Sequence, residues 1–252
     1  MIGIEHSTLT YAWFGLSAVT FLVLQFISAP YGKHIRDGWG PTLPNHIGWA
    51  LMETPPIVMF VWLYFAGNRV GNVVATIFLS LFLIHYVYRG WIYPFRLRTN
   101  GKRMPVLVCL LATFTNIAIG YIQAYWLFTL SEVRDIAYMV DPRFLIGMLL
   151  FAFGYWLNHD SDSRLRNLRK PGETGYKIPK GGGFTYVSSP HYLGELIEWT
   201  GWAIATWGAP TLAFLAWTSC NLVPRASETH QWYLGKFPDY PKRRKRIIPF
   251  LY

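Results

Sequence analysis

The chain has 252 residues, of which 52% are apolar and only 14% are charged. Soluble domains average about 25% charged residues, and the apolar residues here fall in long runs without any charge. A disordered chain is excluded, because 18% of the residues are aromatic. A secreted disulfide scaffold is also excluded, since the two cysteines, Cys109 and Cys220, lie inside apolar runs and are expected to be buried.

Seven apolar segments have the character of membrane helices. The expected spans are residues 11–29, 46–65, 72–93, 105–130, 144–158, 192–207 and 210–232. Pro55 and Pro56 should break the backbone hydrogen bonds of the second span and kink or divide it. A turn at Gly208 to Pro210 separates the last two spans. We therefore expect an all-α integral membrane protein, built as a single domain over residues 1–252.

Lysine and arginine are distributed very unevenly over the loops between these spans. With the N-terminus outside, 20 of the 23 basic side chains lie on the inner side, and only Arg69, Arg134 and Arg143 lie outside. This pattern follows the positive-inside rule, so we expect an outer N-terminus and a cytosolic C-terminus. The membrane is the inner membrane of a bacterium or the endoplasmic reticulum of a eukaryote. The same rule explains the net charge of +10, and no nucleic-acid partner is expected.

Several ionisable residues lie inside the apolar spans or near their ends, where burying a charge costs free energy. Glu53 lies inside the second span, and His85, Tyr86 and Arg89 lie near the inner end of the third. Burying such a group costs several kcal/mol unless it is paired, so it indicates a functional site by default. The alternative is a structural bridge in which Glu53 pairs with His85 or Arg89.

One face of the sixth span carries His191, Glu195 and Glu198 at i, i+4 and i+7. These residue types can ligate a metal, but metal sites in bundles usually draw ligands from several helices. Hydrogen bonding at the helix start, or contact with a ligand, is the favoured interpretation, and no metal is expected.

The segment after the fifth span is predicted to be cytosolic, together with the chain end, as loops over about 159–190 and 225–252. Asn158, Asp162 and Arg169 recur at helical spacing and predict a polar stripe that extends the fifth span. The three glycines at 181–183 allow close approach of the backbone to a ligand. They form no dinucleotide fingerprint, because no strand precedes them and the GxGxxG pattern is absent. The sequence is compatible both with a flexible basic loop and with a loop that closes over a ligand.

Several short segments are specific when taken in order. They are RKPGE at 169–173, GGGFTYVS at 181–188, LGE at 193–195, EW at 198–199, DYPK at 239–242 and IPF at 248–250, with YGKH at 31–34 and HY at 85–86. Together they resemble the steroid 5α-reductase family, the 3-oxo-5α-steroid 4-dehydrogenases, over nearly the whole chain. The vertebrate type-2 enzyme is the member that the sequence is expected to resemble most.

This resemblance implies a membrane enzyme that uses NADPH to reduce the 4,5 double bond of 3-oxo-Δ4 steroids, by hydride transfer to C5 and protonation at C4. Glu53 and Tyr86 match the pair that binds the steroid 3-carbonyl, and Trp49 and Met52 belong to the same substrate site. The steroid is expected to enter from the bilayer. Membrane lipids are the other expected contacts, and no obligate protein partner is evident.

The resemblance also implies a set of cofactor-binding positions. They are Asn158, Asp162, Arg169, Tyr176, His191, Glu195, Arg225 and Tyr233, together with Tyr31, Arg89, Tyr93 and Arg103. Three positions depart from the family pattern. Met52 stands where glutamine is frequent and removes a hydrogen bond toward the steroid, His191 replaces the asparagine of type-2 enzymes, and Lys177 replaces an arginine and loses its bidentate fork.

The chemistry explains the two catalytic residue types. Hydride addition at C5 places negative charge on the C3 oxygen, and one donor aimed at such an oxyanion is worth about 3 kcal/mol. The Tyr86 hydroxyl can donate. Glu53 can donate as a neutral acid, the form that an apolar environment favours, or it can orient Tyr86 as a carboxylate.

Other functions stay open at this point. The chain could reduce a polyprenol, an enoyl-CoA or another sterol. A membrane methyltransferase that uses S-adenosylmethionine shares a similar C-terminal half, and a non-catalytic transporter or lipid-binding protein is a third class. Glu53 and Tyr86 favour a 3-oxo substrate, and the lack of an inverted repeat gives transport no support.

Overall fold

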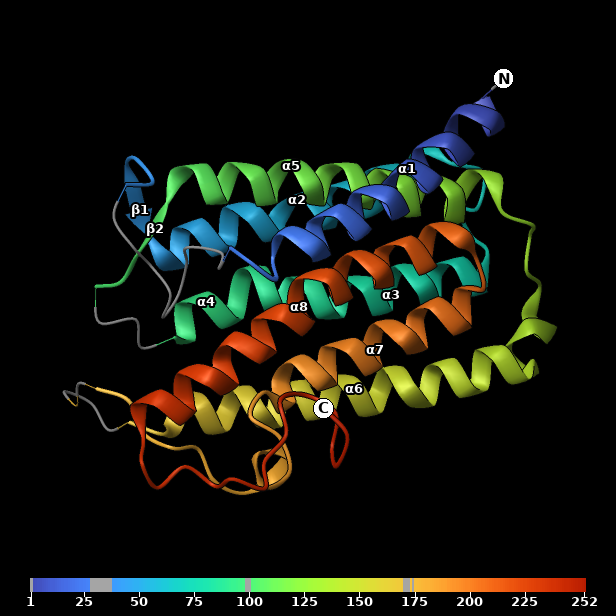
Figure 1. Cartoon of the computed structure of the whole chain (residues 1–252). Coiled ribbons are helices and arrows are strands. Elements are labelled where there is room, and N and C mark those ends of the chain that lie inside the picture. The colour runs from blue at the N-terminus through green and yellow to red at the C-terminus, as the bar shows by residue number, and fades with distance from the viewer. Residues whose placement is uncertain (1, 28–37, 98–100, 170–172, 174) are drawn as a thin grey trace.

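The computed structural model describes residues 2–27, 38–97, 101–169, 173 and 175–252. Figure 1 shows a bundle of long helices that lie side by side. They are α1 (Ile2–Val23), α2 (Asn45–Ala66), α3 (Val73–Val87), α5 (Val106–Tyr125), α6 (Pro142–Asn167), α7 (Pro190–Thr206) and α8 (Ala209–Lys236). A π-helical turn, η2 (Tyr88–Ile92), and the short α4 (Tyr93–Arg96) continue α3, and η3 (Trp126–Leu130) continues α5. The predicted all-α class is confirmed, with seven continuous helices over the described residues.

Short elements complete the described chain. Two 3₁₀ turns, η4 (Ile136–Val140) and η5 (Gly182–Thr185), lie in connections. The strands β1 (Thr42–Pro44) and β2 (Arg103–Pro105) pair antiparallel, with Leu43 opposite Met104. The sequence does not predict this pair of strands, because three-residue strands that end in proline are too short to show an alternation of apolar and polar residues.

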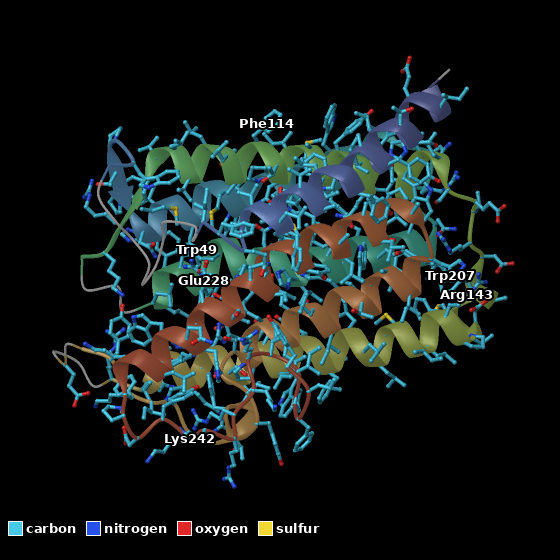
Figure 2. All side chains as sticks on the ribbon, in the orientation of Figure 1. Trp49, Phe114, Arg143, Trp207, Glu228 and Lys242 are labelled. Atoms are coloured by element: carbon cyan, nitrogen blue, oxygen red, sulfur yellow. The ribbon has the colours of Figure 1, made fainter. Side chains whose placement is uncertain are left out.

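Three of the helical segments are long and apolar enough to cross a membrane: Asn45–Ala66, Val73–Arg96 and Val106–Leu130. On α5, Leu107, Leu110, Leu111 and Phe114 form one exposed stripe, and Figure 2 shows Phe114 pointing away from the bundle. An uncovered apolar stripe of this kind suits contact with lipid. The chain is a membrane protein, while the number of crossings and their orientation stay predictions.

The first helix differs from its predicted span of residues 11–29. It begins at Ile2, because nothing breaks the helix there and the hydroxyl of Thr10 donates back to the His6 carbonyl at 3.0 Å. It ends at Val23, where the chain turns and the Gln25 amide donates to the carbonyl of Phe21 at 3.2 Å.

Helix α2 is continuous through Pro55 and Pro56, so the prediction that they could divide it is wrong. Pro56 has no N–H for the carbonyl of Met52 four residues earlier. The side-chain amide of Asn116 on α5 donates to that carbonyl instead, at 2.6 Å. A neighbouring helix therefore replaces the lost bond, which is how prolines are tolerated inside membrane helices.

The two helices next to the expected cytosolic loops are longer than their predicted spans. Helix α6 runs to Asn167, which confirms the predicted extension beyond Asn158. Helix α8 runs to Lys236, so the loop expected from Arg225 begins only at Phe237. Pro224 is accommodated inside α8, and the predicted break between α7 and α8 at Gly208 is confirmed.

The two ends of the bundle differ in the segments that they gather. The strands β1 and β2, helix α4, the 175–189 segment and the start of the tail after Lys236 lie at one end, on the left in Figure 1, and the tail then runs back beneath the bundle. The N-terminal end of α1 and the connection from α5 to α6 lie at the opposite end. The N-terminal end of α1 and the start of the tail therefore lie at opposite ends of the bundle.

Aromatic rings fill the centre of the bundle. Phe60 on α2 stacks on Phe82 of α3, with ring centroids 3.4 Å apart, and Trp199 and Trp202 of α7 pack around Phe82. All four side chains are at most 1% exposed. Because one apolar core joins α2, α3 and α7, these helices hold the polar groups that they carry in a fixed arrangement.

Glycines bring α6 and α7 into backbone contact. A Cβ added at Gly154 would lie 2.2 Å from the backbone nitrogen of Glu198, and one added at Gly194 would lie 2.4 Å from the nitrogen of Asn158. Gly147 and Gly201 make a second such contact two turns away. Small residues that allow close helix approach are typical of membrane bundles. Here they place the polar faces of α6 and α7 directly side by side.

Gly154→Ala should therefore force α6 and α7 apart. Overpacking of this kind costs about 1–3 kcal/mol, which thermal unfolding of the detergent-solubilised protein would measure. Gly15→Ala in α1 is the matched control, because a Cβ there meets nothing within 4 Å. The control should stabilise by about 0.5–1 kcal/mol. Equal melting temperatures for Gly154→Ala and wild type would contradict the close contact.

Candidate active site

A buried hydrogen-bonded pair joins α3 to α7. The Nδ1 atom of His85 lies 2.8 Å from Oε1 of Glu198. Glu198 is completely buried and His85 is 5% exposed. His85 is thus bonded to Glu198 of α7, while Glu53 lies within electrostatic reach of Arg89, the other partner predicted for its structural bridge.

Arg89 is the centre of the polar interior. Its Nη1 atom donates to Oδ2 of Asp162 at 3.0 Å, and its Nη2 atom lies 3.9 Å from Oε2 of Glu195. The guanidinium carbon lies 4.9 Å from the ring centre of Trp49 and 4.8 Å from that of Tyr93. Two carboxylates and two aromatic faces thus hold one cation. The guanidinium joins residues of α2, α4, α6 and α7.

Asn158 and His191 meet where α6 and α7 are in contact. The Asn158 amide donates to the backbone carbonyl of His191 at 2.9 Å. Asn158 and Asp162 lie one turn apart on α6, and His191 and Glu195 lie one turn apart on α7. The helical spacing read from the sequence therefore does bring these four residues to one interface.

Glu53 and Tyr86 lie on neighbouring helices that touch. The Cβ of Glu53 would be 3.1 Å from a Cβ built on Gly90, so α2 and η2 are in close contact at this level. Glu53 interacts electrostatically with Arg89 and Glu195, and Tyr86 does so with Glu53. The two candidate catalytic residues are thus gathered around the arginine.

A cavity of about 300 Å³ opens at the basic end of the bundle. Its lining contains many of the candidate cofactor residues, namely Tyr93, Arg169, Tyr176, His191, Arg225 and Tyr233, and also Trp49 of the candidate substrate site. Further cations line it, among them Lys102, which precedes the candidate Arg103, and Arg166, which lies on the predicted polar stripe of α6. Cationic walls of this kind attract a phosphate-bearing ligand.

Tyr176 is the centre of an aromatic and basic group beside this cavity. Its hydroxyl accepts from Nζ of Lys102 at 2.8 Å, and Arg169 lies 5.9 Å from its ring centre. Trp232 of α8 packs edge-on against the same ring, with centroids 4.7 Å apart. The ring of Tyr176 therefore connects the 175–189 segment with the start of β2 and with α8.

The C-terminal tail holds the 186–188 backbone in place. Ser188 lines the cavity, and its backbone N–H donates to the carbonyl of Lys245 at 2.8 Å. Its hydroxyl lies 2.6 Å from Nδ1 of His230 and 2.7 Å from the hydroxyl of Tyr240. Tyr240 also stacks on Tyr233 with centroids 5.0 Å apart. The tail thus supports two residues of the cavity wall.

Three candidate residues are placed elsewhere or not described. Arg103 is exposed and donates to Thr42 across the β1–β2 pair, at 2.7 Å from Nε, and it lines no part of the cavity. Tyr31 lies outside the described residues. Met52 is buried and packs against Met104 and Cys109, so its side chain belongs to a small apolar cluster between α2 and α5.

Two further features bear on the choice of site. Among the described residues, no group of three His, Cys, Asp or Glu side chains could hold a metal ion. A larger cavity, about 720 Å³, lies at the opposite end of the bundle and is lined by Arg143 and Trp207. Its lining includes none of the candidate residues of the described chain.

The chain is similar to known proteins over most of its length. A model of the 3-oxo-5-alpha-steroid 4-dehydrogenase family matches residues 102–252. Over 237 residues the chain is 43% identical to steroid 5-alpha-reductase DET2 of Gossypium hirsutum, with 92% of both chains covered. Over 248 residues it is 40% identical to 3-oxo-5-alpha-steroid 4-dehydrogenase 1 of Homo sapiens, covering 98% of this chain and 95% of the relative.

The chain belongs to the 3-oxo-5-alpha-steroid 4-dehydrogenase family. The family predicted from the sequence is confirmed, and its members are oxidoreductases. These relatives are a plant enzyme and a type-1 enzyme, so the closer likeness to the vertebrate type-2 enzyme stays a prediction. A full-length match to this family also favours a reductase over a methyltransferase or a transporter.

The residues of this family member fit a dinucleotide phosphate. The cavity wall supplies cations for phosphates and aromatic rings for the flat base. Deeper in, Oε2 of Glu195 is buried, and no residue in the described ranges gives it a hydrogen bond. Glu195 lies one turn beyond His191, which lines the cavity. Its carboxylate faces Arg89 at 3.9 Å and can still accept a hydrogen bond from a ligand.

Asp162→Asn should destabilise this family member by about 3 kcal/mol, because it leaves the buried Arg89 without one of its carboxylates. Asp160→Asn is the matched control on the same helix. Asp160 pairs with Arg164 on the surface, at 2.7 Å from Nε, and such pairs are worth about 0–1 kcal/mol. Chemical unfolding in detergent measures both, and equal losses would contradict the central role of Arg89.

Proposed function

We propose that this chain reduces the 4,5 double bond of 3-oxo-Δ4 steroids to 5α-dihydrosteroids with NADPH as the reductant. The observation that carries the proposal is the gathering of Glu53 and Tyr86 around Arg89, next to a basic cavity, in a member of this family. Type-2 preference is not needed for the proposal and stays a prediction.

NADPH, when bound, supplies the hydride that adds to C5. The Tyr86 hydroxyl donates a hydrogen bond to the C3 oxygen, where negative charge develops as the enolate forms. Glu53 either donates to the same oxygen or accepts from Tyr86 and orients it. Tyr86 or a water molecule then gives C4 its proton. The aromatic packing around Tyr86 keeps bulk water away from that oxygen, which strengthens both hydrogen bonds.

Two phases supply the two reactants in this proposal. The steroid is apolar and reaches the bundle from the bilayer, along the uncovered faces of its helices. The cofactor carries phosphates and reaches the basic end, which we propose to be cytosolic. Support comes from the grouping of the strongly basic tail, helix α4 and the 175–189 segment at that end. The N-terminus then lies on the other side of the membrane.

Product analysis tests the activity. Purified protein with NADPH and testosterone or progesterone should give the 5α-dihydro product. Glu53→Gln and Tyr86→Phe should each lower kcat more than about tenfold while NADPH affinity changes little, because both remove stabilisation of the transition state only. Tyr64→Phe is the matched control, since Tyr64 is equally buried but bonds Thr76 instead, with 2.7 Å between the hydroxyl oxygens.

Each other outcome has a definite meaning. Wild-type turnover in Tyr86→Phe would remove that residue from the mechanism. A folded wild type that binds NADPH and reduces no steroid would contradict the steroid proposal. It would indicate another enone or a polyprenoid as substrate, with Met52 as the first residue to replace by glutamine.

NADPH should also protect the cavity wall from trypsin. Lys177 and Lys180 are exposed and lie in the 175–189 segment, which a ligand bound in the cavity would hold in place. Saturating NADPH should slow cleavage after these lysines about tenfold, by shifting the segment toward its closed state. Cleavage after Arg134, in the connection from α5 to α6 at the opposite end of the bundle, is the internal control. Mass spectrometry of the fragments measures each rate with and without NADPH, and unchanged rates at Lys177 and Lys180 would contradict this closure.

A further inference from the structure

The pair formed by His85 and Glu198 has no role in the mechanism above. It joins α3 to α7 through one hydrogen bond of 2.8 Å inside the bundle. Neither side chain lines the basic cavity. The pair nevertheless lies beside the chemistry, because His85 immediately precedes Tyr86 and their ring centroids are 5.0 Å apart.

Stability alone does not explain this pair. Glu198 is completely buried, and no residue in the described part of the chain gives its Oε2 atom a hydrogen bond. A buried carboxyl with one oxygen unsatisfied costs more than it contributes, and apolar side chains of the same size would do at least as well. The arrangement therefore requires another reason.

We propose that His85 and Glu198 form a positioning pair that fixes the orientation of Tyr86. This inference rests on the proposed function for its effect on turnover. The hydrogen bond sets the rotation of α3 against α7, and the residue that follows His85 turns with the helix. Tyr86 then presents its hydroxyl in one direction.

The aromatic packing around Tyr86 does not by itself fix the rotation of α3 against α7. The Tyr86 ring stacks on Phe82 with centroids 4.5 Å apart, and it lies 5.8 Å from the ring of Trp199. Trp199 also packs edge-on against His85, at 4.5 Å. Flat apolar contacts of this kind limit tilting but have little directional preference, whereas a hydrogen bond is directional.

Both ends of the pair rest on rigid contacts. The backbone of Glu198 is pressed against Gly154 of α6. On the other side of Tyr86, Gly90 is pressed against Glu53 of α2. The segment from His85 to Gly90 is thus fixed against α7 at one end and against α2 at the other, so Tyr86 and Glu53 keep one mutual geometry.

Variants of His85 can keep or remove the bond from its Nδ1 atom to Glu198. Because Nδ1 of His85 contacts Glu198, asparagine places an amide nitrogen at the same position and keeps the bond, whereas glutamine reaches the position of Nε2 and loses it. Glu198→Gln keeps the accepting oxygen without the charge, and Glu198→Leu removes it. His6→Asn is the matched control, since it removes a buried 2.8 Å histidine bond, from Nε2 to the Ile122 carbonyl, at the far end of the bundle.

Two measurements are made on each variant. One is kcat and KM for the steroid and for NADPH. The other needs no activity: ¹⁹F NMR of 3-fluorotyrosine-labelled protein, with the Tyr86 resonance assigned by its loss in Tyr86→Phe. His85→Gln and Glu198→Leu should shift that resonance and lower kcat about tenfold with KM for NADPH unchanged. His85→Asn and Glu198→Gln should keep the resonance and stay within about threefold of wild-type kcat.

Several results would overturn the proposal. They are an unmoved Tyr86 resonance in His85→Gln, equal kcat in the asparagine and glutamine variants, or a loss in Glu198→Gln as large as in Glu198→Leu, which would indicate that the charge matters instead. A kcat loss in His6→Asn would show that any buried histidine bond has this effect. A wild type that reduces no steroid contradicts the proposed function alone, because the NMR response still decides whether the pair orients Tyr86.

Discussion

The burial of Arg89 is the constraint on which the rest of this structure depends. A guanidinium inside a membrane bundle must find carboxylates, because an unpaired charge there costs several kcal/mol. Asp162 and Glu195 supply them from α6 and α7. Both reach the same cation because Gly154 and Gly194 let the two helices touch along their backbones. The charge cluster therefore depends on the glycine contacts, because without them one of the two carboxylates would not reach Arg89.

The cluster also decides where the apolar core ends. Toward the middle of the bundle the contacts are ring on ring, through Phe60, Phe82 and Trp202. Toward the basic end they change to ion pairs and hydrogen bonds. Tyr86 lies at this boundary, with its ring stacked on Phe82 and its hydroxyl within electrostatic reach of Glu53. A site that must hold an apolar substrate and develop charge on one oxygen needs both surroundings within a few residues.

Sequence patterns predict those parts of the fold that depend on local rules. The long apolar runs, the break at Gly208 and the polar stripe that carries α6 to Asn167 follow from hydropathy and helical spacing. Local rules do not predict which residues pair with each other across two helices. The bond from Asn116 to Met52 that keeps α2 continuous over its prolines, and the pairing of His85 with Glu198 instead of Glu53, join residues more than 60 positions apart. Many of the candidate site residues line one cavity, as their helical spacing suggested, whereas Arg103 donates to Thr42 of β1, a pairing that no local pattern indicates.

The surroundings of Arg89 indicate how two phases can meet at one reaction. Trp49 and Tyr93, the two rings on its guanidinium, also line the basic cavity. The cation therefore forms part of the wall between that cavity and the apolar interior that holds Tyr86. Under the proposed function, a cofactor in the cavity would have its phosphates among the exposed cations, and its far end would approach the aromatic rings and the charge cluster around Arg89. Such a wall admits a flat, weakly polar ring and disfavours water and free anions, and that selectivity is what hydride transfer to an apolar enone requires.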